Sequence, residues 1–215
     1  MVLHRAEEDY IKTIYELSLD LDTTIVKTNE MSQRLAITDQ SVNEMIKKLA
    51  KKDLLEFIPY KGVKLSQQGL DEAIRLVRAH RIWEVFLMEH LGFNWEDVHK
   101  EAELLEHAAS NEVIDKLYDF IGKPKYCSHG NPIPDELGNI SKLYNKTLLS
   151  FNPGESFILK RVLDNRALLA FLNENKININ DEFIIDKIDV FNGTISFKNH
   201  DLVISNKVAK LMFGI

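Results

Sequence analysis

Hydrophobic residues recur every three to four positions over the first part of the chain, which predicts a series of amphipathic helices. Residues 5–18 carry the first stripe, with acidic residues in the first turn. Shorter stripes at 27–36 and 41–53 predict two more helices, and we expect Thr28 to cap the first of these. Two β-rich runs then flank the turn at 59–62. This order of elements predicts a winged helix-turn-helix.

Three further helical patterns follow, and each begins at a residue suited to an N-cap, namely Ser66, Asn94 and Ser110. Apolar positions on the first of them exceed what one narrow stripe needs, so we expect a helical core together with a self-association face. From residue 123 a linker rich in Pro and Gly leads to three β-rich runs, with a small helix between the first two. These runs predict a small β-barrel.

The patterns together predict a multidomain chain that is mainly α with a small β part. We expect a winged helix-turn-helix domain at residues 1–66, a helical domain at 67–140, and the β-rich domain at 150–215.

The charge of the chain is unevenly distributed. A formal charge of -6 argues, on its face, against a nucleic-acid binder. Residues 34–64, however, hold seven basic and four acidic side chains, whereas residues 96–119 hold two lysines and eight acidic side chains. This asymmetry indicates two different partners, and a solvated helix face is the alternative in each case. A single cysteine, no apolar run of about 18 residues and no signal sequence predict a reduced, cytoplasmic protein without a membrane partner.

Histidines and carboxylates share helix faces in and before the acidic stretch. His80 and Glu84 lie four residues apart on the long helix. The next helix carries a second set at helical spacing: His99, Glu103, Glu106 and His107. Buried carboxylates repel one another, and a divalent cation replaces that repulsion by coordination. Such oxygen and imidazole donors suit Mn²⁺ or Fe²⁺, and the alternative is an acidic surface with incidental histidines.

Two other classes of protein could carry the same cluster. A metalloenzyme, for example a hydrolase, is one, but the sequence has no HExxH motif, nucleophile elbow or phosphate-binding glycine loop. A winged-helix adaptor with a structural metal is the other. We therefore expect no enzyme activity and no small-molecule substrate.

Several segments resemble, in order, the diphtheria-toxin-repressor and manganese-transport-regulator family of metal-dependent transcriptional repressors. They are DYIKTIYEL, the helix-turn-helix and wing, AHRIWEVFL, VHKEAELLEH and CSHGNPIP. The resemblance spans essentially the whole chain, and its most specific part runs from His99 to His107. It implies an SH3-like C-terminal domain, as in the longer members. It also implies a homodimer that binds a double-stranded DNA operator when metal is bound and controls metal-uptake genes.

The resemblance implies two metal sites in each protomer. The primary site would use Asp9, Glu103, Glu106 and His107. Carboxylates at the first two of these positions match the manganese branch of the family and favour Mn²⁺, with Fe²⁺ as the alternative. The second site, as in the streptococcal-type manganese regulators, would use Glu84, Cys127, His129 and Asp164. His80 and His99 remain as neighbours or alternative ligands of that second site.

The resemblance also places the third helix in the major groove of DNA, with its N-terminal residues toward the base edges. The expected base-reading residues are Thr38, Gln40, Ser41, Asn43 and Glu44. The expected phosphate contacts are Lys47, Lys48, Lys61 and Lys64. Many relatives have two prolines where this chain has Asp39 and Gln40, which points to a different sequence preference.

Overall fold

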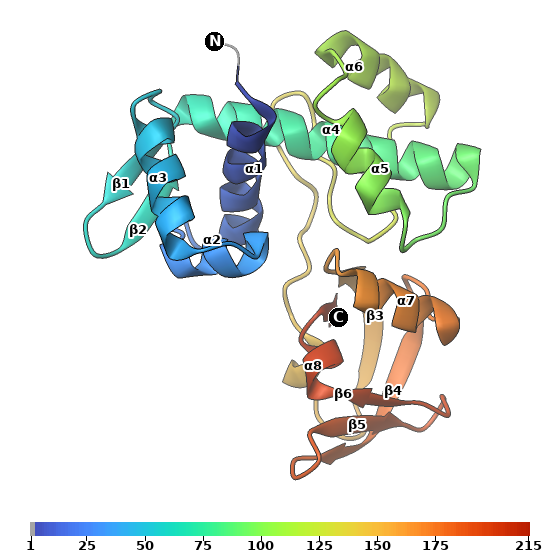
Figure 1. The fold of residues 1–215 in the computed structure, drawn as a ribbon. Helices are drawn as coiled ribbons and strands as arrows, with labels where there is room; N and C mark the ends of the chain where they lie inside the picture. The colour runs from blue at the N-terminus through green and yellow to red at the C-terminus, as the bar shows by residue number, and fades with distance from the viewer. Residues whose placement is uncertain (1–2) are drawn as a thin grey trace. The chain divides into compact units, whose positions relative to one another are not determined.

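The structure is a computed structural model, and it describes residues 3–215. Three helices and a two-stranded antiparallel hairpin form the winged helix-turn-helix at the N-terminal end of the chain (Figure 1). Their bounds are α1 Arg5–Asp20, α2 Thr28–Leu35, α3 Asp39–Ala50, β1 Leu55–Ile58 and β2 Gly62–Leu65. The hairpin is the wing, and its turn falls where the sequence predicts it.

The apolar stripes of these elements form one buried core. Ile11 of α1, Val42 and Leu49 of α3, and Val63 of β2 are completely buried in it. Burial of side chains of this size stabilises the fold by about 1.5–3 kcal/mol each. Helix α3 is therefore fixed against α1 by its inner face, while its polar face stays exposed.

Two helix starts in the winged helix-turn-helix differ from the expected positions. The prediction of Thr28 as an N-cap is wrong, because α2 already begins at Thr28 and Lys27 is the capping residue. The Lys27 amide donates to the Glu30 carboxylate at 2.8 Å, which fixes this helix start from the backbone. Helix α3 begins earlier than expected because Thr38 Oγ1 accepts the amide of Ser41 at 3.2 Å.

Three helices follow the wing: α4 Gln67–Leu91, α5 Val98–Leu105 and α6 Asn111–Phe120. Ser66 and Ser110 cap α4 and α6 as predicted, since each hydroxyl accepts an amide three residues later. Helix α5 begins later than expected, because the amides of Asp97 and Val98 both bond to the carbonyl of Asn94 in a turn before the helix.

The C-terminal part is a five-stranded antiparallel sheet in the order β6-β5-β4-β3-β7. Its strands are β3 Ser156–Val162, β4 Glu182–Asp189, β5 Thr194–Phe197, β6 Val203–Ser205 and β7 Met212–Gly214. The 3₁₀ turn η1 Leu148–Ser150 and the helices α7 Arg166–Glu174 and α8 Asn206–Ala209 accompany it. The sequence predicts β3, β4, β5 and α7 but not the two short strands. Five antiparallel strands around their own buried core agree with the small β-rich domain predicted from the sequence.

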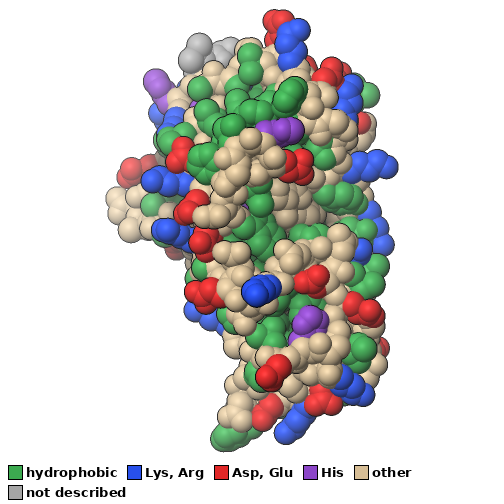
Figure 2. Space-filling view, turned by 90° about the vertical axis from the view of Figure 1, so that its right-hand side faces the viewer, with side chains coloured by type: hydrophobic (Ala, Val, Ile, Leu, Met, Phe, Trp, Pro, Cys, Tyr) green, Lys and Arg blue, Asp and Glu red, His purple; other side chains and the backbone are tan. Residues whose placement is uncertain are grey.

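The described residues divide into two compact units, each with its own core. The first comprises the chain up to residue 80 with 105–114 and 134–139, and the second comprises 81–104, 115–133 and 140–215. The three domain ranges expected from the sequence stay a prediction. On the face drawn in Figure 2, acidic and basic side chains are interspersed. Among the described residues, every helix is too short or too polar to cross a bilayer.

Candidate metal centre

Three of the predicted primary ligands converge in the first unit. Asp9 lies on α1, and Glu106 and His107 follow α5 directly. The Nε2 atom of His107 lies 3.0 Å from Asp9 Oδ1 and 3.4 Å from Glu106 Oε1. Glu106 is completely buried. Two carboxylates and one imidazole thus surround one point, which is a donor set suited to a hard or borderline divalent cation.

The atoms at this point have the unmet bonding capacity that a metal ion requires. Within the described part of the chain, Asp9 Oδ1 and His107 Nε2 are buried and have no hydrogen-bond partner. They approach each other without the geometry of a hydrogen bond. Buried polar atoms are nearly always bonded in native proteins. A divalent cation would coordinate both atoms, so the residues fit a metal ion.

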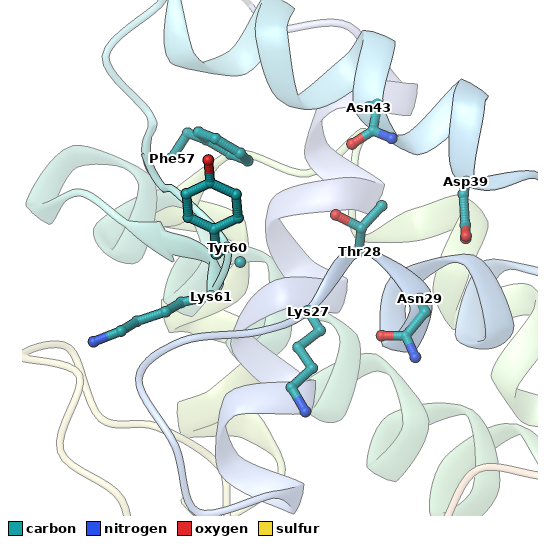
Figure 3. Close-up of a pocket in the computed structure, with 9 residues that line it drawn as sticks. Lys27, Thr28, Asn29, Asp39, Asn43, Phe57, Tyr60 and Lys61 are labelled. Atoms are coloured by element: carbon teal, nitrogen blue, oxygen red, sulfur yellow. The ribbon is translucent and has the colours of Figure 1, made fainter.

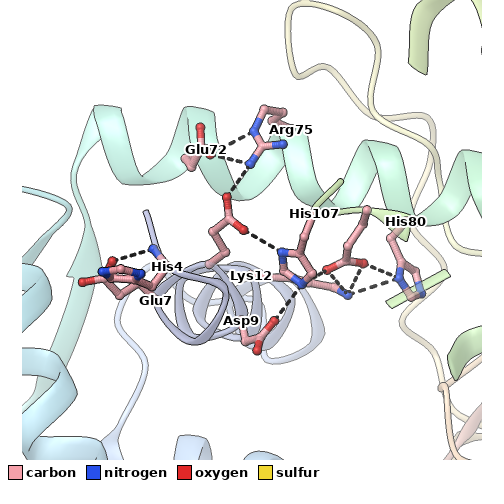
Figure 4. Close-up of polar contacts among 10 residues, drawn as sticks. His4, Glu7, Asp9, Lys12, Glu72, Arg75, His80 and His107 are labelled. Carbon is pink, nitrogen blue, oxygen red and sulfur yellow. Dashed lines mark hydrogen bonds and ion pairs between the residues drawn. The ribbon is translucent and has the colours of Figure 1, made fainter. Parts of the chain in front are cut away.

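Further carboxylates hold the imidazole of His107. Its Nδ1 atom lies 2.6 Å from Glu8 Oε2, and Arg75 donates to the other oxygen of Glu8 at 2.8 Å (Figure 4). Such a chain of contacts fixes the ring orientation of a metal-binding histidine. Burial lowers the pKa of His107, but Asp9, Glu8 and Glu106 raise it further, and the net shift is upward. A metal ion would therefore compete with a proton at this ring.

A buried lysine occupies the opposite side of Glu106. Lys12 Nζ donates to both Glu106 oxygens, at 2.9 and 2.7 Å, and lies 3.2 Å from His80 Nδ1 (Figure 4). The same His80 atom lies 2.5 Å from Glu106 Oε2. Lys12 is not among the residues expected from the sequence. Its position three residues after Asp9 on α1, and so on the same helix face, is the signal that could have identified it.

The residues predicted for the second site meet in the second unit. His129 Nδ1 lies 3.1 Å from Glu84 Oε1 on α4 and 2.9 Å from Asp164 Oδ1 after β3. The ligand atoms of Glu84, Cys127 and His129 lie within 4.8 Å of one another, and all three residues are buried. Within residues 3–215, the buried His129 Nδ1 and Asp164 Oδ1 have no hydrogen-bond partner. This group also fits a divalent cation.

The protonation of this second group depends on its carboxylates. Burial lowers the pKa of His129, but Asp164 and Glu84 raise it well above its ordinary value. Burial, followed by the charge of Glu84, raises the pKa of the Cys127 thiol. The protein without metal therefore favours a protonated imidazole and a neutral thiol, and both would lose protons to become ligands.

The Cys-Ser-His-Gly-Asn turn is built by its backbone. The Cys127 amide donates to Asn131 O and the Gly130 amide donates to Cys127 O, both at 2.9 Å. The Val162 amide of β3 donates to His129 O at 2.9 Å, which anchors the turn on the sheet. Gly130 has a φ of +79°, and a Cβ there would lie 2.0 Å from a backbone oxygen. Glycine is therefore needed at this position for His129 to lie where it does.

His99 and Glu103 lie on α5. His99 is partly exposed, and its Nδ1 atom lies 3.8 Å from Glu84 Oε1 and 3.9 Å from Asp164 Oδ2. These distances place His99 beside the second group, outside direct hydrogen-bond range. Its Nε2 atom lies 3.6 Å from Glu103 Oε1.

The predicted DNA-reading residues line the exposed face of α3 and its N-terminus. Exposed side chains at the predicted positions are Thr38, Gln40, Ser41, Asn43, Glu44, Lys47 and Lys48, with Lys61 and Lys64 on the wing. The hydroxyl of Thr38 also caps the helix, and Gln40 donates to Glu44 at 3.4 Å. Lys48 forms an ion pair at 3.2 Å with the buried carboxylate of Glu7 on α1.

A hollow of about 390 Å³ lies between the wing and the starts of α2 and α3. The exposed rings of Phe57 and Tyr60 lie on one side of it, and Asp39 and Asn43 lie on the other (Figure 3). Lys27 also lines it. Lys27 and the two aromatic residues are not among those expected from the sequence, although Tyr60 lies at the tip of the predicted wing.

A winged helix-turn-helix with an exposed recognition helix, together with buried carboxylate and imidazole clusters, defines a metal-responsive DNA-binding regulator. Comparisons with known proteins agree with that class. The family model for the N-terminal DNA binding domain of iron dependent repressors matches residues 2–63. The model for the metal binding and dimerisation domain of iron dependent repressors matches residues 66–135.

Individual relatives extend the match. The chain is 32% identical to the iron-dependent repressor IdeR of Mycobacterium tuberculosis over 133 residues, which are 61% of this chain and 57% of IdeR. The solved structure of the manganese regulator SloR is 35% identical and aligns over 96% of both chains with a TM-score of 0.81. A manganese-dependent transcriptional repressor in complex with manganese aligns over 97% of this chain and 99% of its own, with a TM-score of 0.86 and 26% identity.

The chain belongs to the iron-dependent repressor family, the metal-dependent transcriptional repressors that include the diphtheria toxin repressor and the manganese regulators. Members of this family are transcriptional regulators, not enzymes. The family and the repressor function expected from the sequence are confirmed.

Proposed function

We propose that this chain is a Mn²⁺-activated repressor of metal-uptake genes that binds its operator as a homodimer, with Fe²⁺ as the alternative activating ion. The carboxylate-rich donor sets support a hard ion, since Mn²⁺ prefers such oxygen ligands. The similarity to SloR, named as a manganese regulator, supports the same ion.

The proposed primary site comprises Asp9, Glu103, Glu106 and His107. The convergence of Asp9, Glu106 and His107 is the observation that carries the proposal, because it joins α1 to a segment nearly one hundred residues away. A bound ion would supply positive charge among these carboxylates. The chain's own residues would then fix α1 more tightly than in the protein without metal.

Helix α1 also holds the recognition helix. Glu7 lies two residues before Asp9, and its carboxylate pairs with Lys48 of α3 and with Lys52 just after it, at 3.2 and 2.7 Å. Fixing Asp9 therefore also fixes the position of α3. A metal that binds the DNA-competent arrangement better than the alternative raises operator affinity, and such coupling is typically worth about 1–3 kcal/mol.

The proposed second site comprises Glu84, Cys127, His129 and Asp164, with His99 and His80 as neighbours. It joins α4, the 127–131 turn and the end of β3 within the second unit. We infer that this site stabilises the attachment of the turn to the sheet and adjusts the response instead of creating it.

The proposed dimer face involves α4 and α6. The sequence predicts a self-association face from the excess of apolar residues on α4, but Leu76, Ile82 and Val85 on that helix are buried within the chain and serve its own core. Exposed apolar side chains remain at Leu91 and Phe120. We infer that a second copy of the chain covers these two side chains.

The test is operator binding measured by fluorescence anisotropy on the gene's own promoter and on promoters of neighbouring transporter genes, titrated with Mn²⁺, Fe²⁺ and Zn²⁺. We expect wild type to bind the operator only when metal is present. Asp9→Ala should show no metal-induced binding at the same metal concentrations. Glu16→Ala, on the same helix, is the control and should respond as wild type does. An Asp9→Ala variant that responds at the wild-type Mn²⁺ concentration would contradict the proposed coupling.

A further inference from the structure

Glu106 lies between two positions that each suit a cation. On one side its Oε1 atom faces His107 Nε2 at 3.4 Å, which is the side of the proposed metal ion. On the other side both of its oxygens accept hydrogen bonds from Lys12 Nζ. Glu106 would therefore lie between the Lys12 ammonium group and the proposed metal ion.

The side of Glu106 that faces Lys12 has the donor atoms of a cation-binding site. Two carboxylate oxygens and the His80 Nδ1 atom lie 2.7, 2.9 and 3.2 Å from Lys12 Nζ. The side chains of Lys12, Glu106 and His80 are at most 5% exposed. An oxygen pair and an imidazole nitrogen around one buried point are donors that a divalent cation also accepts. Here the chain supplies an ammonium group at that point.

We propose that Lys12 is a tethered cation that fills a second ion position of the primary centre, so that this centre accepts one divalent ion instead of two. The inference rests on the proposed function of the Asp9 and His107 side of the pocket. Lys12 would thus determine whether the primary centre binds one divalent ion or two.

Steric and electrostatic arguments both support this role. A metal ion bonded to the same Glu106 and His80 atoms would lie about 2.0–2.6 Å from each of them. That position overlaps the Lys12 nitrogen, which lies only 2.7–3.2 Å from the same atoms. A divalent ion on that side would lie closer to the ammonium group than the ion proposed beside His107 does, so the two cations would repel each other more strongly there. The ammonium group therefore excludes a second ion.

The ammonium group has a second effect in the absence of metal. Glu106 is completely buried, and an unpaired buried carboxylate costs several kcal/mol. Lys12 neutralises it, so the fold tolerates this buried carboxylate in the absence of metal. Removing the ammonium group should make the protein depend on added cations for stability.

The experiment compares wild type with Lys12→Glu, Lys12→Met and the control Lys51→Met, which removes an exposed lysine from the same unit. Bound Mn²⁺ is counted by native mass spectrometry and by equilibrium dialysis of the full chain. Lys12→Glu should bind one more Mn²⁺ per protomer than wild type, because it exchanges the ammonium for a third donor. Its electron paramagnetic resonance spectrum should show the coupling expected of two adjacent Mn²⁺ ions.

Lys12→Met should melt at a lower temperature than Lys51→Met without metal and should recover with Mn²⁺. An unchanged Mn²⁺ count in Lys12→Glu would overturn the inference alone, whereas a wild type that binds no Mn²⁺ would overturn the proposed function together with it. Failure of both Lys12 variants to fold even with Mn²⁺ would also overturn it, since the lysine would then be needed for the fold itself.

Discussion

The ion pairs of Glu7 give a prediction that joins stability to pH. Glu7 is completely buried on α1, and its carboxylate accepts hydrogen bonds from the His4 amide at 2.9 Å and from Lys52 Nζ at 2.8 Å. Burial raises the pKa of Glu7, but the His4 amide, Lys52 and Lys48 together lower it from 4.5 to about 2. The perturbation is Glu7→Gln, which keeps the shape of the side chain and removes its charge.

The size of the effect follows from that pKa. Each pKa unit corresponds to about 1.4 kcal/mol, so the shift sets a ceiling near 3 kcal/mol. Lys48 is half-exposed and Lys52 is partly exposed, and solvent screening reduces the contribution of such pairs. We therefore expect Glu7→Gln to lower the free energy of unfolding by about 1–2 kcal/mol at pH 7.

The sign of the pH dependence is fixed by the direction of the shift. Between pH 4.5 and about 2, Glu7 stays ionised in the folded state but becomes protonated in the unfolded chain. The stabilisation is therefore complete above the unfolded pKa of 4.5 and is lost as pH falls toward about 2. The difference between wild type and Glu7→Gln should shrink over that interval.

Urea unfolding followed by circular dichroism between pH 7 and pH 3 measures this difference. Glu16→Gln, on the same helix and with the same change of charge, is the control and should stay within about 0.5 kcal/mol of wild type. In operator binding, Glu7→Gln should need more Mn²⁺ than wild type for half-saturation, because α3 is held less firmly. Equal stability of Glu7→Gln and wild type at pH 7, or a difference that does not shrink below pH 4.5, would refute the reasoning.

Three further predictions concern the second site and the wing. The double variant Cys127→Ala/His129→Ala should bind one Mn²⁺ fewer per protomer by native mass spectrometry, and an equal count would remove the second site. Gly130→Ala should lower the free energy of unfolding by about 2–4 kcal/mol, because of backbone strain and the Cβ clash. Its control is Gly154→Ala, which has a positive φ but open space around it, and similar losses would contradict the clash argument. Tyr60→Ala should weaken operator binding by about 1 kcal/mol, the value of one hydrogen bond to the DNA backbone, at an unchanged Mn²⁺ count.

The sequence pattern predicts those parts of the fold that depend on contacts between residues close together in the chain. The helical stripe of α1 and the serine caps at Ser66 and Ser110 depend on neighbours within one turn, and these predictions are confirmed. The Thr28 cap fails because the helix start is set by the Lys27 backbone and by Glu30. The three-residue strands β6 and β7 are too short to show a two-residue period, and pairing with β5 and β3 defines them.

The metal sites, too, are predicted from the sequence only where neighbouring residues on one helix define them. Helical spacing places Glu106 and His107 next to a carboxylate one turn earlier, but it does not say which other segment faces them. The resemblance to a family supplied Asp9 as that partner. Neither source pointed to Lys12, because the residue that gives it a role, Glu106, is ninety-four positions away. Which residues bind metal stays a prediction.

Helix α1 provides a route by which a metal ion bound at Asp9 could affect the position of α3. Consecutive residues on a helix point about 100° apart, so Glu7, Glu8 and Asp9 face three different directions. Glu7 reaches the lysines of α3, Glu8 reaches Arg75 and His107, and Asp9 faces His107. A helical turn is rigid on the scale of these contacts, so Asp9 cannot move toward an ion while Glu7 stays in place. The free energy of coordination is then shared with the lysines of α3 through the backbone of a single turn, and no longer pathway is needed.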